Sequence, residues 1–147
     1  MPLPIEVKKL IVADLDEVMA IETQNFKFPW PKAFFLNDLA SPQSICLAGW
    51  IDNKLVSYVM AMPASVELHI TNIAVREGYQ RRGIGSYMMA ELEKCGRDCY
   101  CTYAYLEVRI SNLPAIELYK KIGYHIAYSR KNYYLDGEDA FVMEKML

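Results

Sequence analysis

The sequence predicts an α+β fold, with about four helices and a central mixed sheet of about seven strands. Strands and helices alternate through the middle of the chain in a β-α-β-α-β order, which is typical of parallel pairing. Near both ends, strands instead follow one another directly, which is typical of antiparallel hairpins. With 147 residues, 53% of them hydrophobic, and no internal linker, the chain predicts a single domain over residues 1–147.

The elements of the N-terminal half follow from periodicity and turn residues. Ile5–Ile11 alternates well enough to predict a first strand. Asp14 or Asp16 is a candidate cap for a helix that continues to about Ile21, and Pro31–Leu39 predicts a second, short helix. A hairpin is expected next, with strands at Ser44–Ile51 and Leu55–Ala61. The turn between these strands is Asp52-Asn53-Lys54.

The middle of the chain predicts the alternating part of the fold. Val66–Val75 is a strand, and Tyr103–Arg109, rich in aromatic and branched residues, is the next strand. Between them Gly83–Cys95 predicts a helix. The apolar face of this helix consists of Ile84, Met88, Leu92 and Cys95.

The last helix and the closing strands have clear boundaries. Ser111 or Asn112 caps the helix, Pro114 suits its first turn, and Gly123 ends it. Its expected buried stripe is Ala115, Leu118, Tyr119 and Ile122. The closing antiparallel pair is expected at Tyr124–Arg130 and Ala140–Met146.

Composition excludes several classes of function. A net charge of −2 argues against a broad nucleic-acid surface, and the apolar runs are too short to span a bilayer. Met1-Pro2-Leu3-Pro4 does not resemble a signal peptide. With two histidines and no pair of Cys-x2-Cys units, the four cysteines favour reduced, mostly buried thiols over a metal centre. We therefore expect a cytosolic protein without a metal.

The segment Thr71–Ser86 predicts an anion site. It joins an apolar strand to a helix through Gln80-Arg81-Arg82-Gly83-Ile84-Gly85. Unpartnered N–H groups at a helix start attract phosphate, and glycines let it approach the backbone. The segment lacks the lysine of a Walker loop and the third glycine of a dinucleotide fingerprint. Taken alone, these residues fit a pyrophosphate-bearing ligand or a tight strand-to-helix turn equally well.

Several motifs in order resemble one family. Gln80–Gly85 is similar to the acetyl-CoA signature Q/R-x-x-G-x-G/A of the GNAT acetyltransferase superfamily. Three further segments resemble its RimI branch of ribosomal-protein N-terminal acetyltransferases and the NatA-type catalytic subunits; they are Asn72–Val75, Leu106–Tyr119 and Tyr133–Ala140. The N-terminal half matches more loosely, through Asn25-Phe26 and Pro29-Trp30.

The resemblance implies a layered α/β/α GNAT fold and acetyl-CoA as co-substrate. It implies that the sheet splays between its fourth and fifth strands and leaves a cleft for pantetheine and pyrophosphate. The residues that it assigns to acetyl-CoA are Ile73, Ala74, Val75, Arg81, Arg82, Gly83, Ile84, Gly85, Ser86, Asn112 and Tyr119.

Acetyl transfer to an amine needs a proton acceptor for the amine and a proton donor for the departing thiolate. Glu107 is the candidate base, because the resemblance assigns that role to the glutamate of Leu-Glu-Val-Arg. A salt bridge from Glu107 to Arg109 or Arg82 is the structural alternative. His69 is a competing base or a proton relay, and an ordinary strand-edge histidine is an equally good interpretation. Tyr119 is the candidate acid, although it also belongs to a predicted buried stripe.

The aromatic segments near residues 26–30 and 131–134 are the expected walls of the acceptor groove. The resemblance assigns substrate binding to Phe26, Phe28, Pro29, Tyr133 and Tyr134. Such walls suit an extended N-terminus and hinder a long lysine side chain. The predicted function is therefore acetylation of protein or peptide N-termini, including nascent or ribosomal proteins, by a monomer or weak dimer. The alternatives are a lysine or small-amine acetyltransferase and a non-catalytic CoA-binding module.

Overall fold

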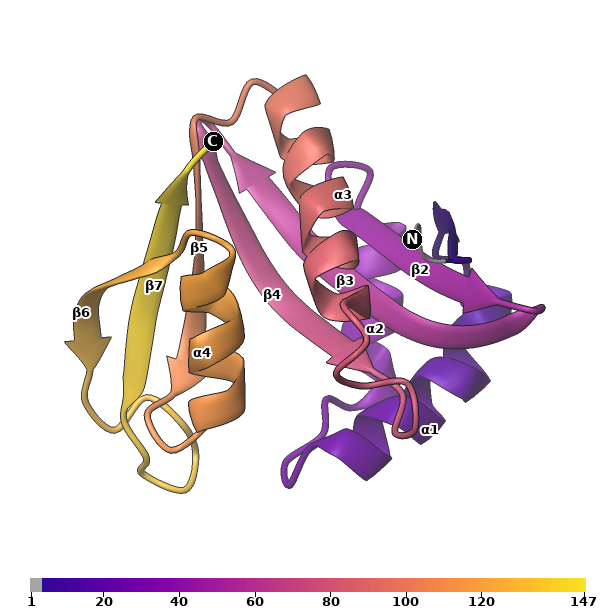
Figure 1. Cartoon of the computed structure of the whole chain (residues 1–147), viewed down its shortest axis with the longest axis horizontal. Helices are drawn as coiled ribbons and strands as arrows, with labels where there is room; N and C mark the ends of the chain where they lie inside the picture. Colours follow the sequence, from indigo (N-terminus) through magenta and orange to yellow (C-terminus); the bar gives the residue numbers. More distant parts are fainter. Residues whose placement is uncertain (1–3) are drawn as a thin grey trace.

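A computed structural model describes residues 4–147 and shows a sheet enclosed by two layers of helices. Figure 1 shows α3 and α4 on one face of the sheet and α1 and α2 behind it. This arrangement confirms the predicted layered fold. Residues 1–3 belong to the segment that was compared with a signal peptide, and that expectation lies outside the described residues.

The sheet contains seven strands in the order β1-β2-β3-β4-β5-β7-β6. Neighbouring strands are antiparallel except for the central pair β4–β5, which is parallel. The predicted mixture of parallel and antiparallel pairing is therefore confirmed. The strands are β1 (Glu6–Lys9), β2 (Ile45–Ile51), β3 (Lys54–Ala64), β4 (Glu67–Val75), β5 (Tyr103–Arg109), β6 (His125–Arg130) and β7 (Ala140–Met146).

The helices agree with the predicted ones in place but differ in their ends. They are α1 (Leu15–Asn25), α2 (Lys32–Ala40), α3 (Ile84–Asp98) and α4 (Leu113–Lys121), and a 3-10 turn η1 (Val12–Asp14) precedes α1. Asp14 occupies the predicted N-cap position of α1, but its carboxylate makes no capping hydrogen bond to that helix and instead accepts one from Ile11 N at η1. The cap of α4 is confirmed, because Asn112 Oδ1 accepts from Ala115 N at 3.3 Å.

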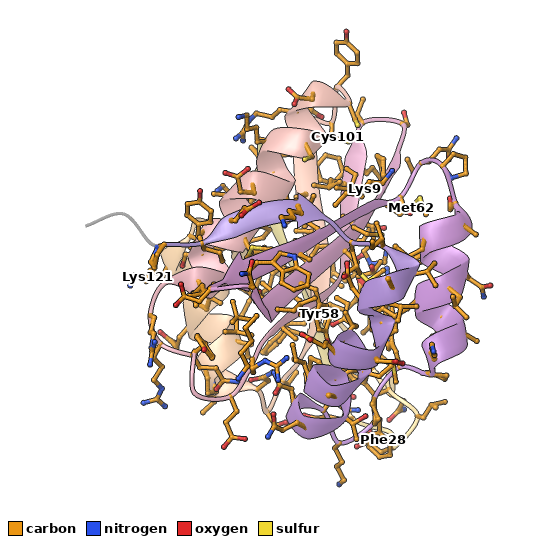
Figure 2. The ribbon with its side chains drawn as sticks, turned by 90° about the vertical axis from the view of Figure 1, so that its right-hand side faces the viewer. Lys9, Phe28, Tyr58, Met62, Cys101 and Lys121 are labelled. Atoms are coloured by element: carbon orange, nitrogen blue, oxygen red, sulfur yellow. The ribbon has the colours of Figure 1, made fainter. Side chains whose placement is uncertain are left out.

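The two faces of the sheet carry separate cores. On one face α3 and α4 pack their buried residues, such as Met88 and Ile116, against strands β3 to β5 and β7. On the other face α1 and α2 pack against β2 and β3, and Phe35 meets Tyr58 edge to face. Figure 2 shows Tyr58 inside this second layer, between the sheet and α1. The predicted stripe of α4 needs a correction, because Ile116 and Tyr119 are its buried residues while Ala115, Leu118 and Ile122 are partly buried.

The strands β4 and β5 separate partway along their length. They pair only over Glu67–His69 and Tyr103–Tyr105, whereas β4 continues to Val75 and β5 to Arg109. Backbone groups of β4 beyond His69 therefore have no partner strand on that side. The predicted splay between the fourth and fifth strands is confirmed.

A β-bulge in β4 changes which side chains face each layer. Asn72 pairs with Met60 and Ile70 pairs with Ala61, so that Thr71 is the extra residue. Before the bulge Leu68 and Ile70 belong to the α3 core, whereas after it Asn72 contacts α1. The bulge turns Ile73 and Val75 toward the α3 side, where the strands separate.

The four cysteines are free thiols, of which Cys46 and Cys101 are buried, Cys95 is half-buried and Cys99 is exposed. The expectation of mostly buried thiols is thus met at two positions. Within residues 4–147 no cluster of three potential metal-ligating side chains is found. Nor does any helix of this described part have the length and apolar character to cross a membrane.

Candidate active site

A cleft of about 680 Å³ opens where β4 and β5 separate. Its floor is the end of β4, and the start of α3 and one side of α4 form its walls. Nearly all of the residues that the sequence assigned to the cofactor line this cleft, namely Ile73, Ala74, Val75, Arg81, Gly83, Ile84, Gly85, Ser86, Asn112 and Tyr119. Arg82 is outside the lining, and its guanidinium lies over the Tyr79 ring at 5.3 Å.

The start of α3 has the features of an anion site. Gly83 precedes the helix with φ +81°, a conformation that side-chain-bearing residues adopt at a cost. No side chain of the described residues caps this end, so its first N–H groups point into the cleft unpartnered by the protein. A Cβ on Gly85 would lie 3.3 Å from Leu118, so the glycine also lets α3 approach α4 closely.

Glu107 forms the centre of a second group at the same splayed strands. Its Oε1 lies 2.7 Å from His69 Nε2, and Tyr133 donates its hydroxyl to the same oxygen at 3.3 Å. The Glu107 side chain is 9% exposed and that of His69 is 32% exposed. The His69 ring is stacked on Tyr105, with centroids 4.4 Å apart. The structural alternative for Glu107 is wrong, because its carboxylate contacts His69 and neither Arg109 nor Arg82.

Tyr119 reaches the cleft from α4. It is almost fully buried, and burial raises the pKa of its hydroxyl well above the usual value near 10. The hydroxyl therefore stays protonated at any physiological pH. Burial also raises the pKa of Tyr134 to about 12, with Arg109 acting in the opposite direction.

The expected acceptor residues occupy two loops that approach each other. Phe28 from the α1–α2 loop and Tyr134 from the β6–β7 loop both lie against the guanidinium of Arg109, at 5.4 and 4.0 Å. Tyr133 packs edge to face on Tyr134. Phe28 is half-exposed at the end of the molecule opposite Cys101 (Figure 2). The other two expected residues differ, because Phe26 lines the large cleft and Pro29 is exposed.

A buried carboxylate that was not predicted from the sequence fixes the α1–α2 loop. Glu22 is 1% exposed and accepts hydrogen bonds from Tyr58 Oη at 2.5 Å, Asn72 Nδ2 at 3.0 Å and Trp30 N at 2.9 Å. One signal was available, because Glu22 falls four residues after the buried Val18 on the apolar face of α1. A carboxylate in that position must be paired.

Arg109 and Asn25 were also missed as site residues. Asn25 donates its side-chain amide to Val75 O at 2.8 Å, which joins the end of α1 to the end of β4 at the cleft. Arg109 was considered only as a partner of Glu107, yet its partners are Asp136 and Glu138 in the β6–β7 loop. Both carboxylates lie within Tyr133–Ala140, one of the segments that resemble the family, but their pairing with Arg109 could not be predicted from that segment alone.

Comparisons with known proteins agree with this geometry. The model of the Acetyltransferase (GNAT) family matches residues 15–124. An N-alpha-acetyltransferase of Sulfurisphaera tokodaii is 33% identical over 145 residues, which cover 90% of this chain and 87% of that protein. The ribosomal protein bS18-alanine N-acetyltransferase of Salmonella typhimurium is 34% identical over 142 residues, covering 91% and 92%. The crystal structure of the ribosomal-protein-S18-alanine N-acetyltransferase from Escherichia coli superimposes with a TM-score of 0.88 at 30% identity, covering 97% and 93%.

The fold, the splayed strands and the cleft are those of an acyltransferase that uses an acyl-CoA. The chain belongs to the GNAT family of acetyltransferases. It is an acetyl-CoA-dependent acetyltransferase. The residues of the cleft fit this co-substrate, because an uncapped helix start preceded by a left-handed glycine suits a pyrophosphate. The unpaired edge of β4 suits an amide-bearing arm.

Proposed function

We propose that residues 1–147 form one acetyltransferase domain that transfers an acetyl group from acetyl-CoA to the N-terminal α-amine of a protein or peptide. The observation that carries this proposal is the meeting of two aromatic loops over Arg109, two residues along β5 from Glu107. The N-terminus of an extended peptide can enter between such walls. An internal lysine could enter only if the peptide main chain on both sides of it lay across the groove. The names of the two relatives above are consistent with such an acceptor.

The chemistry rests on residues from opposite sides of the splayed strands. Acetyl-CoA supplies the thioester, and its phosphates would lie on the N–H groups at Gly83–Ser86. Glu107 accepts the proton of the attacking amine, and the half-exposed His69 that contacts it passes the proton toward solvent. Burial keeps the Tyr119 hydroxyl protonated by raising its pKa, and this hydroxyl donates its proton to the departing thiolate.

An α-amine is easier to deprotonate than a lysine side chain, because its pKa is lower. A protein α-amine has a pKa near 8, so roughly a tenth of it is neutral at pH 7, whereas a lysine with a pKa of about 10.4 is far more rarely neutral. One carboxylate with a histidine relay is therefore sufficient for an N-terminus.

A pair of peptides tests the proposal. One has a free N-terminus, and the other has the same sequence with a blocked N-terminus and an internal lysine. We expect the free peptide to be acetylated far faster, as measured by CoA release and by mass spectrometry. Ribosomal and other N-terminal sequences then rank the natural acceptors.

Equal rates on the two peptides would contradict the N-terminal assignment while leaving an acetyltransferase. Faster transfer to small polyamines would favour a small-amine enzyme. Tight CoA binding without turnover on any amine would favour a non-catalytic module.

A further inference from the structure

Arg109 occupies a position that links the two walls of the acceptor groove. It lies at the end of β5, and its side chain is 25% exposed. Its Cζ is 4.0 Å from the centre of the Tyr134 ring, in the β6–β7 loop, and 5.4 Å from that of Phe28, in the α1–α2 loop. A guanidinium can stack on aromatic rings, and here one guanidinium lies over a ring of each wall.

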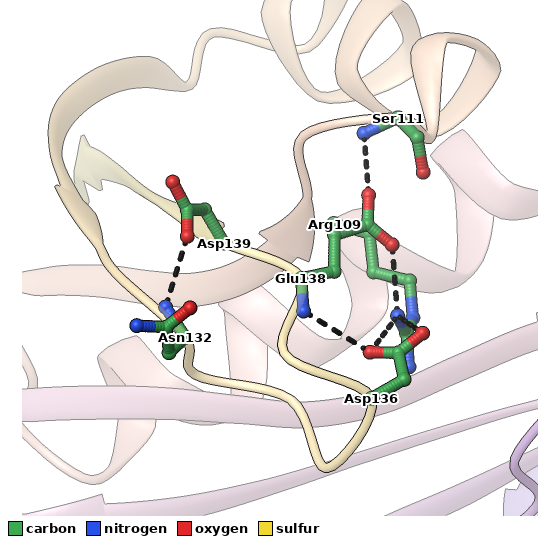
Figure 3. Close-up of polar contacts among 6 residues, drawn as sticks. All are labelled: Arg109, Ser111, Asn132, Asp136, Glu138 and Asp139. Atoms are coloured by element: carbon green, nitrogen blue, oxygen red, sulfur yellow. Dashed lines mark hydrogen bonds and ion pairs between the residues drawn. The ribbon is translucent and has the colours of Figure 1, made fainter.

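The edge of the same guanidinium is held by carboxylates of one wall. Arg109 Nη1 donates to both oxygens of Asp136 at 3.0 Å and to Glu138 Oε1 at 2.8 Å (Figure 3). The other oxygen of Glu138 accepts from Ser111 N at 3.0 Å, which ties the loop to the end of β5. The orientation of the guanidinium plane is therefore defined by charge-assisted hydrogen bonds.

The opposing loop carries a positive charge that favours the ionised form of the same carboxylate. Lys27, next to Phe28, contributes to lowering the pKa of Asp136, after the larger effects of Arg109 and the Glu138 backbone. Glu107, two residues from Arg109 on β5, takes its contacts from His69 and Tyr133 instead. Arg109 therefore forms its ion pairs with the carboxylates of the β6–β7 loop and not with the candidate base Glu107.

We propose that Arg109 is a positioning residue that sets the width and orientation of the acceptor groove by holding Phe28 and Tyr134 against one guanidinium plane. The inference rests on the proposed function, because it assigns these loops to the acceptor. Arg109 acts through the two rings and makes no contact with the reacting atoms. Its loss should therefore affect acceptor binding and selectivity more than the chemical step.

Arg109→Lys tests this role, because lysine keeps the positive charge but lacks the flat faces and the fork of donors. We expect the peptide KM to rise about tenfold, since the lost contacts with the aromatic rings and the altered hydrogen bonds to the carboxylates are each worth about a factor of ten or less. The kcat should change by less than about threefold, and the CoA Kd in calorimetry should be unchanged. Selectivity between peptides with a small and a large first residue should narrow.

Two further variants separate positioning from general stability. Arg97→Lys makes the same change on the exposed end of α3 and should leave KM, kcat and selectivity unchanged. In a Phe28→Leu background, Arg109→Lys should have a smaller effect on KM, because one of the two rings is already missing. An unchanged peptide KM in Arg109→Lys, or a fall in kcat alone, would overturn the proposal.

A readout without turnover distinguishes this inference from the proposed function. With fluorophenylalanine at position 28, Asp136→Asn on the opposite wall should shift the fluorine NMR signal, because Arg109 connects the two sites. The shift should disappear when Arg109→Lys is already present. If Asp136→Asn does not shift the fluorine signal, the inference about Arg109 is contradicted, whatever the enzyme acetylates. If the signal shifts but no peptide is acetylated, the inference about Arg109 is supported and the assignment of the acceptor is contradicted.

Discussion

The loop before α3 and the β6–β7 loop lie on the two sides of the splayed strands and are built in different ways. The first presents backbone N–H groups, and Gly83 at its end, together with Gly85 in the first turn of α3, leaves these two positions of the helix start free of side chains. The second is held by side chains, among which Arg109, Asp136 and Glu138 make the ionic contacts. One surface is therefore formed by local backbone geometry and the other by residues that come together only in the folded chain.

The difference explains how each side tolerates change. A backbone site depends on a conformation that one residue can block, so single substitutions there should act strongly and on the cofactor alone. A side-chain network distributes its contacts over several residues, so its loss should be gradual and affect the acceptor. The four predictions that follow test this contrast, from the largest expected effect to the smallest.

Gly83→Asp should weaken CoA binding by about 2–4 kcal/mol, because it adds a carboxylate and side-chain bulk where the phosphates would lie. Calorimetric titration measures the loss. Gly83→Ala is the matched control, since it has the same strain at φ +81° without the charge and should lose less affinity. Unchanged CoA affinity in a folded Gly83→Asp protein would remove the basis of the assigned cofactor site.

Glu107→Gln and Tyr119→Phe should each lower kcat by about 10²-fold or more, within the usual range for acid–base groups. CoA affinity should remain nearly intact, because neither residue holds the phosphates. Steady-state kinetics and calorimetry measure the two effects separately. If His69→Ala costs more than Glu107→Gln, the role of base passes to His69.

Tyr134→Ala should raise the peptide KM by about tenfold or less and relax the preference for a free N-terminus, because it opens one wall of the groove. The CoA Kd should not change, which is the behaviour expected of the side-chain surface. Kinetics with the free and blocked peptides measure both effects. A larger change in CoA binding than in peptide KM would contradict the separation of the two surfaces.

Acid should loosen the β6–β7 loop. Hydrogen bonds from Arg109 lower the pKa of Asp136, and hydrogen bonds from Ser111 and Arg109 lower that of Glu138. Groups with a depressed folded pKa stabilise the fold above their unfolded values, near 4, and this contribution disappears as pH falls through the folded pKa. Urea unfolding between pH 6 and 3 should show a steeper loss in wild type than in Asp136→Asn/Glu138→Gln. Parallel curves would show that these ion pairs contribute no stability.

The sequence by itself determined the elements and the backbone site. Alternation and capping residues act within a few positions, so strands such as Tyr103–Arg109 and the Asn112 cap were predicted in place. The loop before α3 was predictable for the same reason, because glycines and a helix start are adjacent along the chain. At Asp14 the position of the cap was predicted and only the capping hydrogen bond differs, so the difference is confined to the end of a helix.

Only the tertiary structure decided the partners of the charged residues. Glu107 has a possible partner two positions away, yet it pairs with His69, which is 38 residues distant in the chain. Arg109 instead reaches the β6–β7 loop, and Glu22 joins α1 to β3, β4 and the α1–α2 loop. Such pairings depend on strand register, on the bulge at Thr71 and on which face each side chain occupies. These quantities depend on the packing of the whole sheet, and no short stretch of sequence specifies them.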